Sequence, residues 1–175
     1  MIQFFKNLIR RLFSNSKSEA VKKPKRKAIK IYLASPLNED RREALFKAVK
    51  MLRNKGYEVY NPLEHKVVHE WDLPNTEWGF AVFIHDTDAI LDSDFVVCLN
   101  YGREFTTGGT VLEQGMAFMA GEKFGNPKVI LVEMTDNVQS LMVANARYAT
   151  VKGLEGLEKY DFKNPKPLRV DTKQK

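Results

Sequence analysis

Short apolar runs alternate along the chain with longer segments whose apolar residues recur every three or four positions. The runs predict buried strands at residues 28–36, 57–60, 94–100, 128–132 and 148–151. The periodic segments predict helices at about 39–55 and 78–91, a helix that contains 113–120, and shorter ones at 137–144 and 154–157. This alternation favours an α/β fold in which helices cover both faces of a parallel sheet.

Glycine, asparagine and proline mark the ends of several predicted elements. Asn38 is a candidate cap for the first helix, and Gly56 ends that helix. Asn61-Pro62 ends the second strand, and residues 63–76 follow no regular pattern. Gly121 or Gly125 ends the helix that follows the third strand.

Basic residues are concentrated at the start of the chain. Residues 1–30 hold ten Lys or Arg and one Glu, a net charge of +9, and the whole chain of 175 residues carries +6, so the remainder carries −3. Because the basic charge is not spread over the folded part, nucleic acid is not an expected partner. We expect a basic arm and linker at 1–28, one domain at 29–168 and a tail at 169–175.

The first 16 residues have an amphipathic pattern. Ile2, Phe5, Ile9, Leu12 and Phe13 fall on one helical face. The segment is too short to span a bilayer, and it lacks the uninterrupted apolar centre of a secretory signal. Three roles stay open: contact with an anionic membrane surface, an organelle presequence, and a helix that packs on the body or on a neighbouring subunit.

Cys98 is the only cysteine and lies inside an apolar run. A disulfide framework is therefore excluded, and a reducing cytoplasm is the expected compartment. Because no residue nearby in the sequence would activate the thiol, we predict that Cys98 is a small buried hydrophobe.

Gly108-Gly109 follows the third predicted strand, and Glu113 follows the glycines. We expect the glycines in a loop at the carboxyl end of that strand, where ligands bind in open α/β sheets. Glu113 is expected in the first turn of the next helix, whose N-terminus favours a carboxylate, as a nucleophile needs. The same residues also fit a capping box from Thr110 to Glu113, and this window alone favours neither interpretation.

Other ionisable residues give weaker signals. Asp94 directly precedes the third strand, and Asp86 lies in a helical pattern, where an exposed charge is the ordinary explanation. His65 and His69 have the spacing of two metal ligands on a helix, but Lys66 stands where the metalloprotease pattern needs glutamate, and no third ligand is evident. The sequence has neither a Walker loop nor the dinucleotide-binding glycine spacing. No metal and no cofactor are expected.

An ordered set of motifs resembles the nucleoside 2-deoxyribosyltransferase family. In chain order they are Ile31-Tyr32-Leu33-Ala34-Ser35-Pro36, Glu77-Trp78, Asp86 with Asp94, Gly109-Thr110-Val111-Leu112-Glu113-Gln114-Gly115, Ser140-Leu141-Met142 and Glu158-Lys159-Tyr160-Asp161-Phe162. The likeness runs from about Ile29 to Leu168 and leaves out the arm. It implies a flavodoxin-like (Rossmann-like), doubly wound parallel sheet of about five strands in a single domain.

The resemblance also implies roles for the matching residues. Glu113 would attack the anomeric carbon of a 2′-deoxynucleoside to form a glycosyl-enzyme, and Asp86 would donate a proton to the leaving base. Tyr32 would position the nucleophile, and Trp78 would stack near the base. A second base, or water, would then take the sugar. Further residues expected to bind substrate are Ser35, Gly109 and Met142.

Three positions depart from the pattern of the family's transferases. Thr107 stands in place of an acid, Lys66 in place of a glutamine, and Ser140 in place of an asparagine that a neighbouring subunit of a homo-oligomer supplies. Hydroxyl groups at 107 and 140 donate to a phosphate, which a carboxylate would repel. Related deoxynucleoside 5′-monophosphate N-glycosidases carry hydroxyl residues at these two places.

The sequence therefore leaves two enzymatic interpretations. The first is deoxyribosyl transfer between a deoxynucleoside and a free nucleobase, a reaction of nucleotide salvage. The alternative is hydrolysis of a deoxynucleoside 5′-monophosphate by the same residues. The presence of both Glu113 and Asp86 speaks against a third interpretation, a non-catalytic nucleotide-binding module.

Overall fold

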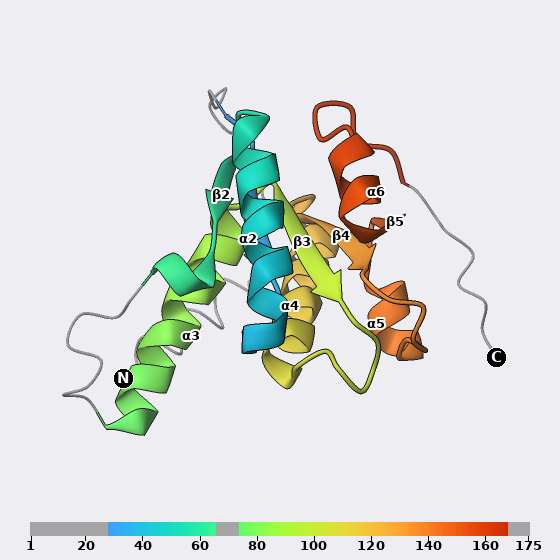
Figure 1. Ribbon diagram of the computed structural model, residues 1–175. Coiled ribbons are helices and arrows are strands. Elements are labelled where there is room, and N and C mark those ends of the chain that lie inside the picture. Colours follow the sequence, from blue (N-terminus) through green and yellow to red (C-terminus); the bar gives the residue numbers. More distant parts are fainter. Residues whose placement is uncertain (1–27, 66–73, 168–175) are drawn as a thin grey trace.

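The computed structural model describes residues 28–65 and 74–167. Within these residues, five parallel strands form one sheet in the order β2-β1-β3-β4-β5 (Figure 1). The strands are β1 Lys30–Ala34, β2 Glu58–Tyr60, β3 Phe95–Asn100, β4 Lys128–Glu133 and β5 Ala149–Lys152. This is the flavodoxin-like strand order, which confirms the expected fold and places the topological switch point between β1 and β3.

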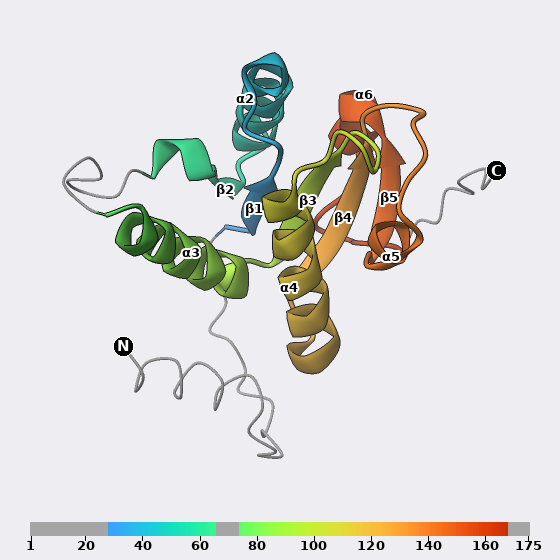
Figure 2. The ribbon, with the colours of Figure 1, turned by 90° about the horizontal axis from the view of Figure 1, so that it is seen from below.

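Helices cover both faces of the sheet, as predicted. They are α2 Glu39–Asn54, α3 Asn75–Asp92, α4 Gly108–Phe124, α5 Leu141–Asn145 and α6 Gly153–Lys159, with a short 3₁₀ helix η1 at Pro62–Glu64. Figure 2 shows α2 and α6 on one side of the sheet and α3 and α4 on the other. In the described parts of the chain, no helix is long and apolar enough to cross a membrane. Most of the basic arm lies outside the described residues.

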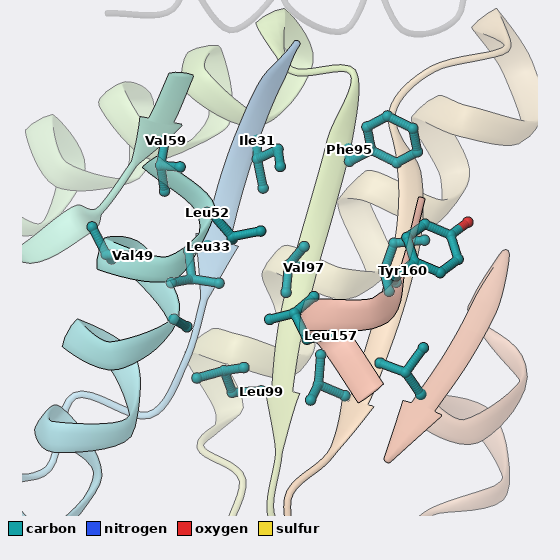
Figure 3. Packing of buried hydrophobic residues seen from close by; sticks show 14 of the residues in the cluster. Ile31, Leu33, Val49, Leu52, Val59, Phe95, Val97, Leu99, Leu157 and Tyr160 are labelled. Carbon is teal, nitrogen blue, oxygen red and sulfur yellow. The ribbon is translucent and has the colours of Figure 1, made fainter. Parts of the chain in front are cut away.

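The face under α2 and α6 is filled by large aliphatic and aromatic side chains. Ile31 and Leu33 of β1 point to this face, as do Val97 and Leu99 of β3 (Figure 3). Leu52 of α2 and Leu157 of α6 pack against them. Alternate residues of a strand point to opposite faces, so Tyr32 and Ala34 of β1 point the other way.

The face under α3 and α4 is built from smaller side chains around one tyrosine. Tyr32, Ala34, Val96 and Cys98 are fully buried here, together with Ile90 of α3. Cys98 is a buried free thiol, as the sequence predicts. Burial, with the nearby charge of Glu113, raises the pKa of this thiol.

Helix α4 begins earlier than the sequence indicates. Thr107, not Thr110, is its N-cap residue, and the Thr107 side chain accepts from the Thr110 backbone N–H. The predicted capping box of Thr110 and Glu113 is therefore wrong. The two glycines lie in the first turn of α4 rather than in a loop, and Glu113 lies in the second turn. The helix ends at Gly125, whose φ of 82° is the left-handed conformation that glycine adopts without strain.

Helix α5 is shorter than predicted and begins at Leu141 instead of residue 137. The preceding residues are bound to the loop after β3. The Asn137 side chain donates to the Tyr101 carbonyl at 3.0 Å, and the Val138 carbonyl accepts from Arg103 N–H at 3.0 Å. At Gly102 a side chain would overlap Asn137, because a Cβ there would lie 2.5 Å from the Asn137 Cβ. This close contact between two loops replaces the first predicted turn.

Candidate active site

Tyr32 and Glu113 form the centre of the candidate site. The Tyr32 hydroxyl, which β1 presents toward α4, donates to Glu113 Oε1 at 2.9 Å. Burial and the negative charge of Asp86 raise the pKa of Glu113 to about 7, although the hydrogen bond from Tyr32 acts in the opposite direction. We expected the helix N-terminus to hold Glu113 ionised. Instead, Glu113 lies a turn further along α4, and burial there raises its pKa.

Asp86 and Tyr60 form a second carboxyl–tyrosine pair beside the first. Asp86 lies in the second half of α3, and its Oδ1 accepts from the Tyr60 hydroxyl at 3.2 Å. Burial raises the pKa of Asp86, whereas the hydrogen bond from Tyr60 lowers it. Asp86 is thus not the exposed helix charge that its local sequence suggests.

Aromatic stacking connects the two pairs. Tyr32 and Tyr60 are register partners in β1 and β2, and their rings stack with centroids 5.2 Å apart and planes 14° apart. The His65 ring stacks on Tyr60 with centroids 4.0 Å apart and planes 2° apart. Three rings therefore form a continuous stack, whose two tyrosines each donate to a carboxyl group.

The first turn of α4 is open. Side chains at Gly108 or Gly109 would meet no atom within 4 Å, and both residues are exposed. Thr107 is also exposed, and its hydroxyl lies 3.0 Å from that of Thr110 as part of the helix cap. The backbone N–H groups of a helix N-terminus attract anions, so this turn is accessible to the polar end of a substrate.

Gln114 ties α5 to the helix that carries Glu113. Its buried Nε2 donates to the carbonyls of Val143 at 2.7 Å and Ala146 at 2.9 Å. These bonds fix α5 beside α4. Ser140 precedes α5 as its N-cap residue, and its side chain makes no cap hydrogen bond.

The other predicted site residues have varied surroundings. Ser35 is buried directly after β1, and its hydroxyl donates to the Pro36 carbonyl at 3.2 Å. Trp78 lies in the first turn of α3 and is 40% exposed, and Met142 is 82% exposed. Lys66 lies outside the described residues. Asp94 is structural, because its carboxylate accepts from the Lys30 N–H at 2.9 Å.

His65 stacks on Tyr60, and its predicted metal partner His69 lies outside the described residues. Among the residues that the structure describes, no group of three or more His, Cys, Asp or Glu is placed to hold a metal ion. The arrangement supports chemistry by a carboxylate nucleophile and a carboxylic acid.

Two residues at the site were missed in the sequence. Tyr60 is the last residue of a short strand and carries the same alternation that buries Tyr32, but only the register shows that the two are neighbours. Gln114 directly follows Glu113 and belongs to a motif that gives it no role of its own. Its carbonyl partners are 29 and 32 residues away, which a local pattern does not reveal.

Fold and site together define an α/β enzyme with two coupled carboxyl groups at the switch point of a doubly wound sheet. The family model for nucleoside 2-deoxyribosyltransferase matches residues 31–166. The chain belongs to this family, whose members are enzymes of the deoxyribosyltransferase or N-glycosidase type.

Solved structures agree with this assignment. The 2-deoxyribosyltransferase of Bacillus psychrosaccharolyticus is 30% identical, with a TM-score of 0.65 over 80% of this chain and 99% of that chain. A conserved protein from Enterococcus faecalis (19% identity, TM-score 0.63, 75% of this chain and 96% of that one) shares the fold. A CMP N-glycosidase from Clostridium botulinum (18% identity, TM-score 0.50, 74% of this chain and 95% of that one) also shares the fold. No curated protein sequence matches the chain.

Proposed function

We propose that this protein is a nucleoside 2-deoxyribosyltransferase in which Glu113 is the nucleophile and Asp86 the general acid. One observation carries the proposal. Two carboxyl groups each accept a hydrogen bond from a tyrosine hydroxyl, and the rings of these two tyrosines stack on each other at the switch point of the sheet. The 30% identical 2-deoxyribosyltransferase supports the same reaction class.

In the first half-reaction, a Glu113 carboxylate oxygen forms a bond to C1′ of the deoxyribose as the bond from C1′ to the base nitrogen breaks. The electron pair of the broken bond stays on the base, which takes the proton of Asp86. The products are a glycosyl ester on Glu113, a free base and an ionised Asp86. General acid catalysis of this kind contributes on the order of 10²–10⁴-fold.

In the second half-reaction, a nitrogen of the acceptor base attacks C1′ and releases the Glu113 carboxylate. The nitrogen loses its proton to Asp86, which restores the starting state. Two displacements at C1′ retain the configuration of the sugar, as in retaining glycosidases.

Electrostatics limits the ionisation of the pair. The charge of Asp86 raises the pKa of Glu113, so a state with one ionised carboxyl group is favoured over a state with two. The cycle starts from the singly ionised state in which Glu113 is charged and Asp86 is protonated, whereas the raised pKa of Glu113 favours the state in which only Asp86 is charged. The Tyr32 hydroxyl, which donates to Glu113, favours charge on the nucleophile.

Mass spectrometry of the intact protein tests the proposal. A slow 2-fluoro sugar analogue of a deoxynucleoside that the enzyme turns over should add one sugar mass, on a peptide that contains Glu113. An adduct on a different side chain, or normal turnover by the Glu113→Ala variant, would overturn the assignment of the nucleophile.

Hydrolysis of a deoxynucleoside 5′-monophosphate is the second candidate. It is favoured by the open first turn of α4, where Thr107 brings a hydroxyl and no negative charge. Deoxynucleosides and their monophosphates, each tested with and without a free base, separate the two reactions. A transferase forms a new nucleoside only with the acceptor, whereas a hydrolase releases sugar phosphate at the same rate in both conditions.

We also propose that the protein is a homo-oligomer. Apolar side chains at the surface of α4 and α5 are exposed by more than half, namely Leu112, Met119, Phe124, Leu141 and Met142. Three of them lie along α4, beside an apolar groove of about 670 Å³ between α3 and α4. Exposed apolar area of this kind marks protein–protein contact, and a second copy would bring its own Ser140 region toward a neighbouring site.

Light scattering measures the oligomeric state directly. The substitution Met119→Asp should shift the protein to monomers and lower its activity. A monomeric and active parent protein would overturn both the oligomer and the role of Ser140 in a neighbour's pocket.

A further inference from the structure

Tyr60 connects the two tyrosine–carboxyl pairs of the site. One pair contains Asp86, the proposed acid, and the other contains Glu113, the proposed nucleophile. Its hydroxyl donates to Asp86 Oδ1, and its ring stacks on Tyr32, whose own hydroxyl donates to Glu113. The Tyr60 ring also stacks with the His65 ring. Tyr60 therefore holds Asp86 directly and is connected to Glu113 through Tyr32.

The hydrogen bond determines which oxygen of Asp86 carries the transferable proton. A protonated carboxyl group has one O–H, and the oxygen that accepts from Tyr60 is Oδ1. Burial and the charge of Asp86 raise the pKa of Tyr60, so its hydroxyl keeps its proton throughout the cycle. With Tyr60 as the donor to Oδ1, the acidic proton is carried by Oδ2.

The surroundings of Tyr60 keep it in place. Arg53 of α2 donates to both carboxylate oxygens of Glu64 at 3.0 and 2.6 Å, and to the Val59 carbonyl at 2.9 Å. Glu64 belongs to η1, which directly precedes His65, and Val59 directly precedes Tyr60. One guanidinium therefore holds together the two backbone segments that bring His65 onto Tyr60.

We propose that Tyr60 is a positioning residue for proton transfer: it holds Asp86 by Oδ1, so that Oδ2 presents the proton to the leaving base. The ring stack of His65, Tyr60 and Tyr32 keeps the acid at a constant position relative to the nucleophile. This inference rests on the proposed function, because it takes Asp86 as the acid and Glu113 as the nucleophile.

A double-mutant cycle tests the inference. The substitution Tyr60→Phe keeps the ring stack and removes only the hydroxyl. It should slow the formation of the Glu113 adduct about 10- to 100-fold, the size of a lost hydrogen bond to a charged group. In an Asp86→Asn background, where no acidic proton remains to be positioned, the same substitution should change the rate by less than about 3-fold.

Tyr57→Phe is the matched control. Tyr57 lies three residues earlier, and its ring packs edge-on against Phe162, on the opposite face of the sheet. Its rate of adduct formation should equal that of the parent protein, and thermal unfolding of every variant verifies that it is folded.

The outcomes separate the two proposals. An equal slowing by Tyr60→Phe in both backgrounds, or no slowing in either, would overturn the positioning role while the Glu113 adduct still forms. Absence of any Glu113 adduct in the parent protein, with a substrate that it turns over, would overturn the proposed function and this inference together.

Discussion

The two faces of the sheet differ in what their side chains do. Under α2 and α6, the inward residues of the central strands are large and apolar, such as Ile31, Leu33 and Leu99. Under α3 and α4, the same strands present Tyr32, Ala34 and Cys98. Strand β1 therefore contributes Ile31 and Leu33 to the core on one side, and on the other side the Tyr32 hydroxyl that donates to Glu113.

The difference shows how a buried ionisable group is accommodated. On the α3–α4 face, the hydroxyl of the buried Tyr32 donates to Glu113. Burial on that face raises the pKa of both Glu113 and Asp86, so ionisation of these two groups lowers the stability of the fold. On the opposite face, aliphatic side chains such as Ile31, Leu33 and Leu99 have no ionisable group and stabilise the sheet by apolar burial.

The largest expected effect on activity comes from a substitution on the α3–α4 face. Glu113→Gln keeps the size of the side chain and removes the nucleophile, so the rate of deoxyribosyl transfer should fall by about 10⁴-fold or more. Glu122→Gln, at an exposed position on the same helix, should leave the rate unchanged. High activity of purified Glu113→Gln would show that the face has another nucleophile.

A substitution on the α2–α6 face should affect stability alone. Leu33→Ala removes a fully buried side chain and leaves a cavity, which should lower the free energy of unfolding by about 2–5 kcal/mol. The activity of each folded molecule should stay within about 2-fold of the parent. Denaturant unfolding measures the loss, and Phe46→Ala, at a residue that is 48% exposed on α2, should cost much less. A larger loss of activity than of folded protein would contradict the division between the faces.

Stability should depend on pH through the ionisation of Glu113. Below pH 4.5, Glu113 is protonated in both the folded and unfolded states, and the unfolded state ionises as the pH rises above that value. The folded state ionises only near pH 7, so stability falls by roughly 3 kcal/mol between these values and then stays level. Glu113→Gln removes this fall, so its free energy of unfolding should gain on the parent from pH 4 to pH 8. An unchanged difference would show that Glu113 ionises at its ordinary pKa.

The smallest expected effect is that of Tyr32→Phe. The Tyr32 hydrogen bond lowers the pKa of Glu113, so removal of the hydroxyl should raise that pKa further. The rate near neutral pH should fall about 10-fold, and the rise of activity with pH should move to higher pH. Stability should change by less than about 1 kcal/mol, because the ring and its stacking remain. A uniform fall at all pH values would indicate lost binding instead.

Much of the fold was predictable because it follows from local patterns. Apolar runs predicted β1, β3 and β4 within a few residues. Gly56 was correctly expected as a helix end, and Gly125 was one of the two ends expected for the helix after β3. The start of α4 was missed because Thr107 and Thr110 are equally good caps by residue type, and only backbone geometry distinguishes them. The start of α5 was missed because its first predicted turn is instead bound to the loop after β3.

The site was predictable only in part. Glu113 came from the glycine pattern as well as from the resemblance, whereas Asp86 and Tyr32 came from the resemblance alone. All three roles stay predictions until an adduct is measured. From its local sequence, Asp86 looks like an exposed helix charge. Tyr60 carries no signal of its own, since its partner Asp86 is 26 residues away.

The sequence by itself determined the type and order of the strands and helices, because these depend on residues a few positions apart. It also determined the family, because the motifs occur in order along the chain. Only the tertiary structure decided the pKa of Glu113 and the oxygen by which Asp86 is held. Desolvation and hydrogen bonding depend on groups from distant segments, such as Tyr32 and Glu113, 81 residues apart, which the sheet brings within 2.9 Å.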